Sequence, residues 1–179
     1  MAETPTSRIW AGRFKYVGLV AVIFFVQLMP LNAIPVRFTG PDLLLLVTLA
    51  YAARRPDYLP FGLIMVVFLL ADLLFQRPPG LWAALVCILS EMLRAQSRGL
   101  RNVPLLLEWG TVSLGIVAIT LGYRLILAIT VVPQAPLALT LIQMVMTIVA
   151  YPVVVLVAQL IFGITRPAPG QTDSFGHKL

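Results

Sequence analysis

Long uninterrupted apolar runs are the feature that most restricts how this chain can fold. The two longest cover residues 104–132 and 137–164, and shorter runs precede them. A helix of about 20 residues crosses the roughly 30 Å hydrocarbon core of a bilayer. Because lipid offers the backbone no hydrogen-bond partner, a spanning segment must be a helix or a strand of a closed barrel. Continuous runs, rather than alternating segments of about ten residues, predict helices.

The composition places the chain in the membrane class. Hydrophobic residues make up 60% of its 179 residues and charged residues only 11%, against about 45–50% and about 25% in soluble domains. We therefore expect an all-α membrane protein. The 13 basic and 7 acidic residues leave a net charge of +6. The basic residues are scattered between apolar runs without a basic stripe, which favours contact with anionic lipid headgroups over nucleic acid.

Six apolar segments, joined by short connectors rich in Pro, Gly and Arg, predict a bundle of six transmembrane helices over residues 16–164. Residues 1–15 and 165–179 are then cytoplasmic tails. The second and fourth segments are short, a length also found in re-entrant or partly buried helices. The expected spans are about 16–31, 41–53, 58–75, 81–93, 104–132 and 137–164.

The distribution of basic residues predicts the topology. With six spans and a cytoplasmic N-terminus, the basic residues of tails and connectors divide 10:2 between inside and outside, and without the second span only 8:4. The positive-inside rule therefore favours six spans with both termini cytoplasmic. The arginines expected to face the cytoplasm or the headgroups include Arg54, Arg55, Arg94, Arg98 and Arg101.

Four ionisable residues lie within the expected spans, where charge is costly and points to a partner or a function. We expect Asp72 in the outer part of the third span, with Arg124 or backbone amides as its structural partner. Glu91 and Glu108 are expected near the cytoplasmic face. For Glu91 and Arg124, snorkelling to an interface is an equally good interpretation. Asp42 precedes a helical run and is expected to cap it.

Small residues in the fifth span predict close approach of another helix. Thr111 and Gly115, and likewise Ala118 and Gly122, are four residues apart, a spacing that brings them onto one helix face. We expect Gly115 and Gly122 to belong to an interaction surface for a partner.

No motif for catalysis or for metal or cofactor binding is present. The only histidine, His177, lies near the C-terminus, and Cys87 is the only cysteine. The chain has no phosphate-binding glycine loop and no HExxH, CxxC or GxSxG motif. The sequence therefore predicts no catalytic residue, no metal site, no cofactor and no enzymatic activity.

Three stretches together resemble the MreD family of bacterial rod-shape proteins: "GPDLLLLVTLAYAARRP", "LLADLLFQRPPG" and "LWAALVCILSEMLRAQSR". The matching features are Pro41-Asp42 before the second span, Arg54-Arg55-Pro56 after it, Asp72 late in the third span and Gly80 before the fourth. The resemblance covers about residues 10–165. Members of the family often have several glycines in the third span, whereas this chain has only Gly62 there.

The resemblance implies a non-enzymatic scaffold in the bacterial cytoplasmic (inner) membrane. Its expected partner is an MreC-like protein with a single span. Indirect partners are the MreB filament, the glycan polymerase RodA and its transpeptidase, which together build lateral peptidoglycan. The fold that the family implies is similar to the six-helix substrate-binding component of ECF-type vitamin transporters.

Two other functions stay open. The chain could be the substrate-binding membrane subunit of an ECF-type vitamin importer, with a ligand in an outward cavity. Few polar residues are expected to line such a cavity: Gln27, Asp72, Tyr123 and Arg124. A channel or proton-coupled transporter would require Asp72 to titrate on a conducting path, and the sequence offers no chain of such groups.

Overall fold

All regular secondary structure in the described part of the chain is helical. The computed structural model describes residues 5–29, 40–100 and 104–162, and within them it contains six α-helices, one 3-10 helix and no strand. The all-α prediction is thereby confirmed for these residues. The elements are α1 (Pro5–Leu28), α2 (Leu43–Arg54), η1 (Pro56–Tyr58), α3 (Phe61–Leu74), α4 (Leu81–Leu100), α5 (Leu105–Ile129) and α6 (Leu137–Phe162).

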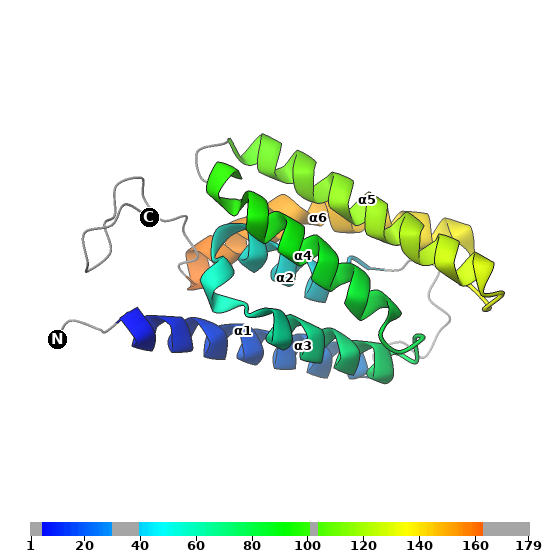
Figure 1. Cartoon of the computed structure of the whole chain (residues 1–179), viewed down its shortest axis with the longest axis horizontal. Coiled ribbons are helices and arrows are strands. Elements are labelled where there is room, and N and C mark those ends of the chain that lie inside the picture. The colour runs from blue at the N-terminus through cyan, green and yellow to red at the C-terminus, as the bar shows by residue number, and fades with distance from the viewer. Residues whose placement is uncertain (1–4, 30–39, 101–103, 163–179) are drawn as a thin grey trace.

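Consecutive helices run in opposite directions, so the bundle has two distinct ends (Figure 1). At one end α2 finishes, α3 and α5 begin, and α4 and α6 finish; we call it the Arg54 end. At the opposite end α2, α4 and α6 begin and α3 and α5 finish; we call it the Asp42 end. The predicted topology places the Arg54 end in the cytoplasm and the Asp42 end outside.

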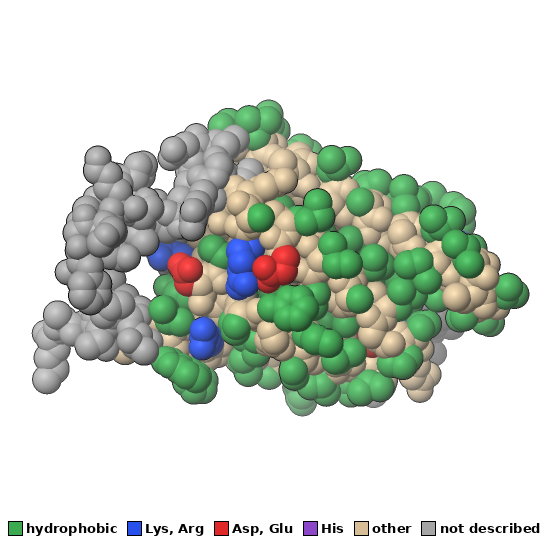
Figure 2. Space-filling model, viewed as in Figure 1, with side chains coloured by type: hydrophobic (Ala, Val, Ile, Leu, Met, Phe, Trp, Pro, Cys, Tyr) green, Lys and Arg blue, Asp and Glu red, His purple; other side chains and the backbone are tan. Residues whose placement is uncertain are grey.

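Three helices are long and apolar enough to cross a bilayer: α1 from Ile9, α5, and α6 as far as Leu160. Two further apolar helices, α2 and α3, have only 12 and 14 residues. At about 1.5 Å per residue, α2 rises roughly 18 Å, well short of a core of about 30 Å. The structure thus supports a helical membrane protein, but not the finer statement that six helices cross. Figure 2 shows one largely apolar face whose charged side chains gather toward one end.

Two helices extend beyond the apolar runs that predicted them. Helix α1 begins at Pro5, inside the expected tail 1–15, and α4 continues past residue 93 to Leu100. Arg, Lys, Gln and Ala, which occur in these extensions, favour helix whether or not they favour lipid, and proline suits the first helical position. Hydropathy therefore underestimates the lengths of these two helices. The expected tail 165–179 and the final residues of the first and sixth expected spans lie outside the described residues.

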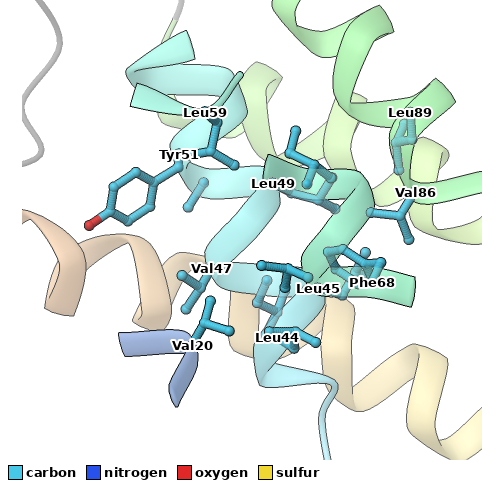
Figure 3. Close-up of a cluster of buried hydrophobic side chains, with 14 of the residues drawn as sticks. Val20, Leu44, Leu45, Val47, Leu49, Tyr51, Leu59, Phe68, Val86 and Leu89 are labelled. Atoms are coloured by element: carbon cyan, nitrogen blue, oxygen red, sulfur yellow. The ribbon is translucent and has the colours of Figure 1, made fainter. Parts of the chain in front are cut away.

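Helix α2 is the centre of the bundle. It packs against α4 and α6 and also contacts α1, and every residue from Leu44 to Arg54 is buried. Figure 3 shows Val47 of α2 beside Val20 of α1, and Leu45 beside Phe68 of α3. A helix that is hydrophobic on all sides is expected to be enclosed. Because neighbouring helices surround α2, it need not match the bilayer thickness itself.

Helix α1 adds a mixed apolar and polar contact to α2. Its buried residues Tyr16, Val20 and Ile23 recur at helical spacing and form one face. The Tyr16 hydroxyl is hydrogen-bonded to Thr48 Oγ1 at 3.0 Å, and Thr48 in turn donates to the Leu44 carbonyl. The Tyr16 and Tyr51 rings meet edge to face with centroids 5.4 Å apart. The buried hydroxyl groups of Tyr16 and Thr48 are therefore hydrogen-bonded within the bundle.

Candidate functional site

A buried ion pair with a tyrosine closes the Arg54 end of the bundle. Arg54 Nε donates to Glu108 Oε1 at 2.9 Å, and Arg54 Nη2 donates to Glu108 Oε2 at 3.2 Å. The Tyr151 hydroxyl also donates to Glu108 Oε1, at 2.8 Å. The three residues come from α2, α5 and α6 and are 5%, 1% and 0% exposed. We call this group the Arg54–Glu108–Tyr151 cluster.

This cluster corrects the expectation that Arg54 faces the cytoplasm or the headgroups. Arg54 ends a helix that is buried on every side, so its guanidinium meets a carboxylate of α5 before it reaches a surface. A planar guanidinium binds a carboxylate through two parallel hydrogen bonds. The cluster joins three helices through buried side chains.

Asp72 lies at the end of α3, fully buried, and binds the start of α4. Its Oδ2 atom accepts hydrogen bonds from Gly80 N at 2.9 Å and from Ala83 N at 3.2 Å. The first amides of a helix lack partners within the helix, and the helix dipole favours a negative charge there. Gly80 makes the turn possible, because its φ of +88° is readily adopted only by glycine. Of the two partners expected for Asp72, the structure supplies the backbone amides.

Arg124 is not brought to Asp72. Its Nη1 atom donates to Thr140 Oγ1 at 2.7 Å and to the Ala135 carbonyl at 3.2 Å. Gln134 Nε2 donates to the Arg124 carbonyl at 3.1 Å. Among the described residues, the partners of this guanidinium are therefore neutral and belong to α6 and to the segment before it.

Glu91 pairs with Arg94 on the same helix. The two side chains approach to 2.9 Å and are 39% and 32% exposed. Arg94 also donates to the Pro56 and Leu59 carbonyls. Glu91 and Arg94 thus tie α4 to the turn between α2 and α3 near the surface, while Glu108 belongs to the buried cluster. The side chains of Arg98 and Arg101 lie outside the described residues.

Asp42 caps α2 as its position predicts. Its Oδ1 atom accepts from Leu45 N at 3.0 Å, and its own amide donates to Thr147 Oγ1 of α6 at 3.0 Å. The cap satisfies one of the free amides at the helix start. The second bond fixes the start of α2 against α6.

The two glycines expected in an interaction surface differ in what surrounds them. A methyl group placed on Gly115 would overlap the Leu89 side chain of α4. At Gly122 the nearest such atom is Leu85 Cδ2 at 4.0 Å, an ordinary contact. Gly115 therefore allows α5 to pack closely on α4 within the chain. At Gly122 there is space for a larger side chain.

A cavity of about 380 Å³ opens at the Asp42 end, between α2, α4, α5, α6 and the connectors beside them. Besides Trp82, ten of its lining residues carry polar side chains. The expectation that few polar residues could line such a cavity is therefore wrong, and of the four expected residues only Tyr123 and Arg124 line it. The polar lining from α5 and α6 is Thr120, Tyr123, Arg124, Thr140, Gln143 and Thr147.

A sequence signal for this cavity exists at helical spacing. Thr140, Gln143 and Thr147 fall on one face of an otherwise apolar α6, because i, i+3 and i+7 share a helix face. Thr120 and Arg124, four residues apart, likewise share one face of α5. A polar stripe on a membrane helix predicts a face turned away from lipid. No such signal connects Arg54 with Glu108 and Tyr151.

No group of three or more His, Cys, Asp or Glu residues within the described ranges is placed to hold a metal ion. In comparisons with family models, curated proteins and solved structures, the chain matches none of them.

Proposed function

We propose that this chain is a six-span membrane scaffold of the rod-shape (MreD) type. The observation that carries the proposal is the use of the charged groups inside the bundle to join helices. Arg54, Glu108 and Asp72 bind side chains or amides of neighbouring helices. A protein whose intramembrane charges stabilise its own fold suits a role in holding partners together.

The proposed location is the bacterial inner membrane, with both termini in the cytoplasm. The alternating helix directions are compatible with this topology (Figure 1). Arg54, Arg55 and Arg94 share the Arg54 end, whereas Arg77 and Arg124 belong to the Asp42 end. The excess of arginines at one end supports a cytoplasmic Arg54 end through the positive-inside rule.

The proposed partner is an MreC-like single-span protein, and through it the MreB filament, RodA and its transpeptidase. The exposed face of α5 is the proposed contact surface. Leu114, Ala118, Leu121 and Leu125 are exposed there and recur at helical spacing on one face. Of the small residues expected in this surface, Ala118 is thus available, whereas Gly115 packs on α4.

Co-purification with a co-expressed MreC-like protein in a mild detergent tests the proposal. We expect association with the native chain and its loss in Ala118→Trp, which places a bulky ring on the exposed α5 face. Ala84→Trp, an exposed alanine of α4, is the matched control and should retain association. Failure of the native chain to associate would overturn the scaffold proposal, and equal binding by both variants would exclude the α5 face.

The substrate-binding subunit of an importer is a second candidate, because the cavity at the Asp42 end favours it. The cavity is large enough for a small ligand and has a polar lining. Co-expression with an energising ATPase subunit separates the two functions. Stable pairing with that subunit, without association with an MreC-like protein, would favour the importer.

A further inference from the structure

The cavity at the Asp42 end results from the shortness of α2. Its neighbours α5 and α6 contain 25 and 26 residues against 12 in α2, a difference of roughly 20 Å in length. Beyond the start of α2 the surrounding helices therefore enclose space. A second cavity, of about 500 Å³, adjoins this region and shares Asp42, Arg77, Trp82 and Gln143 with the first.

The lining of the first cavity carries two guanidinium groups, those of Arg77 and Arg124, and one carboxylate, that of Asp42. Arg124 is held by a hydroxyl and a carbonyl, both neutral. Arg77 lies over the rings of Phe75 and Trp82, 5.5 and 5.6 Å from their centroids. Both guanidinium groups are half-buried, and a partly desolvated charge is stabilised by an anion or by water.

The nearby carboxylates are already bound elsewhere. Asp42 caps α2 through Leu45 N, and Asp72 directs Oδ2 to the amides of Gly80 and Ala83. Neither makes an ion pair with Arg77 or Arg124. Arg77 lies near enough to Asp72 to act on that carboxylate electrostatically, whereas Arg124 binds only neutral groups. The charge of Arg124 in particular is therefore available to a ligand.

The rest of the cavity suits a ligand with both a charged and an apolar part. Trp82 and Tyr123 form an edge-to-face pair with centroids 5.2 Å apart, and both line the cavity together with Leu127 and Met144. The second cavity continues toward apolar residues such as Phe68 and Phe75. A guanidinium presents planar donors that match phosphate oxygens.

We propose that the cavity at the Asp42 end binds a phosphate-bearing ligand through Arg77 and Arg124, with its apolar part against Trp82 and Tyr123. The phosphate belongs either to a lipid headgroup, whose chains would enter the second cavity, or to a soluble phosphate ester. The site is compatible with the scaffold and with the importer subunit, so it stands independently of the choice between them.

Binding to the purified full-length chain in detergent tests the site with three probes. Native mass spectrometry measures retention of phosphatidylglycerol and of diacylglycerol with the same chains, which lacks the phosphate. Calorimetric titration measures binding of glycerol 3-phosphate. We expect one phosphate-bearing probe to bind and diacylglycerol not to bind. Retention of phosphatidylglycerol alone identifies a lipid source, and binding of glycerol 3-phosphate identifies a soluble one.

Arg77→Gln and Arg124→Gln should each weaken binding of the phosphate-bearing probe about tenfold or more, as expected for loss of a hydrogen bond to a charged group. Lys15→Gln is the matched control, because it removes a positive charge from an exposed site on α1 toward the Arg54 end, and should leave binding unchanged. Arg124→Lys retains the charge and should keep part of the affinity, which covers the case in which Arg124→Gln fails to fold. No binding of either phosphate-bearing probe, or equal binding by native chain, both Gln variants and control, would overturn the proposal.

Discussion

The arginines at the two ends of the bundle have opposite kinds of surroundings. At the Arg54 end, Arg54 pairs with Glu108 in a site that is almost fully buried, and the Tyr151 hydroxyl also donates to Glu108. At the Asp42 end, Arg77 and Arg124 are half-buried and line a cavity, and neither makes an ion pair with a carboxylate of the described residues. Removing one partner of a paired and enclosed guanidinium destabilises the fold, whereas a guanidinium that lines a cavity with neutral partners can bind a ligand.

The largest expected loss of stability comes from breaking the Arg54–Glu108 ion pair. Glu108→Gln removes the charge that compensates Arg54, and loss of one partner of a buried pair costs about 3–5 kcal/mol. Unfolding in detergent, followed by circular dichroism, measures this loss. Glu91→Gln is the control, since its partly exposed pair with Arg94 should contribute only about 0.2–1 kcal/mol. Equal losses in the two variants would contradict the structural role assigned to the cluster.

The second prediction compares how tightly α5 is packed at Gly115 and at Gly122. Gly115→Ala forces the Leu89 side chain of α4 to move, and overpacking of this kind costs about 1–3 kcal/mol. Gly122→Ala, beside cavity residues Tyr123 and Arg124, meets only ordinary contacts and should be neutral or stabilising by up to about 1 kcal/mol through helix propensity. Unfolding in detergent, followed by circular dichroism, measures the stability of both variants. A neutral Gly115→Ala would show that α5 does not approach α4 this closely.

A third, smaller effect concerns Asp72. Asp72→Ala leaves the amides of Gly80 and Ala83 without their acceptor and should cost about 1–2 kcal/mol, as for other helix caps. Asp72→Asn keeps an acceptor and loses only the charge at the helix start, which is worth about 0.3–1 kcal/mol. Unfolding of the two variants measured side by side tests this order. If Asn were as harmful as Ala, the charge of Asp72 would matter more than its hydrogen bonds.

The smallest effect on stability is expected at the cavity. Arg124→Gln loses bonds to a neutral hydroxyl and carbonyl, so the free energy of unfolding should fall by no more than about 1 kcal/mol. Arg54→Gln is the paired comparison and should destabilise by about 3–5 kcal/mol. A loss at Arg124 as large as that at Arg54 would show that the two ends do not differ in the way we describe.

Hydropathy predicted the helical class and the approximate places of the helices, because both depend on residues close in sequence. The capping role of Asp42 followed from its place before an apolar run. Backbone amides were one of two partners expected for Asp72, and the structure shows that they belong to Gly80 and Ala83. The spacing of Gly115 correctly indicated a close helix approach, but could not say that α4 is the neighbour. Arg54 was assigned to a surface because positive-inside counting treats connector arginines as exposed.

The sequence by itself determined an all-helical, membrane-like chain whose charges lie near helix ends, because propensity and hydropathy are local properties. Only the tertiary structure decided that α2 is enclosed, since a largely apolar helix of 12 residues would equally suit a partly inserted helix. The pairing of Arg54 with Glu108 spans 54 residues and depends on which helices are neighbours. The cavity depends on the mismatch in length between α2 and the helices around it. Both are properties of the packed bundle, because they arise from contacts between segments that no local pattern relates.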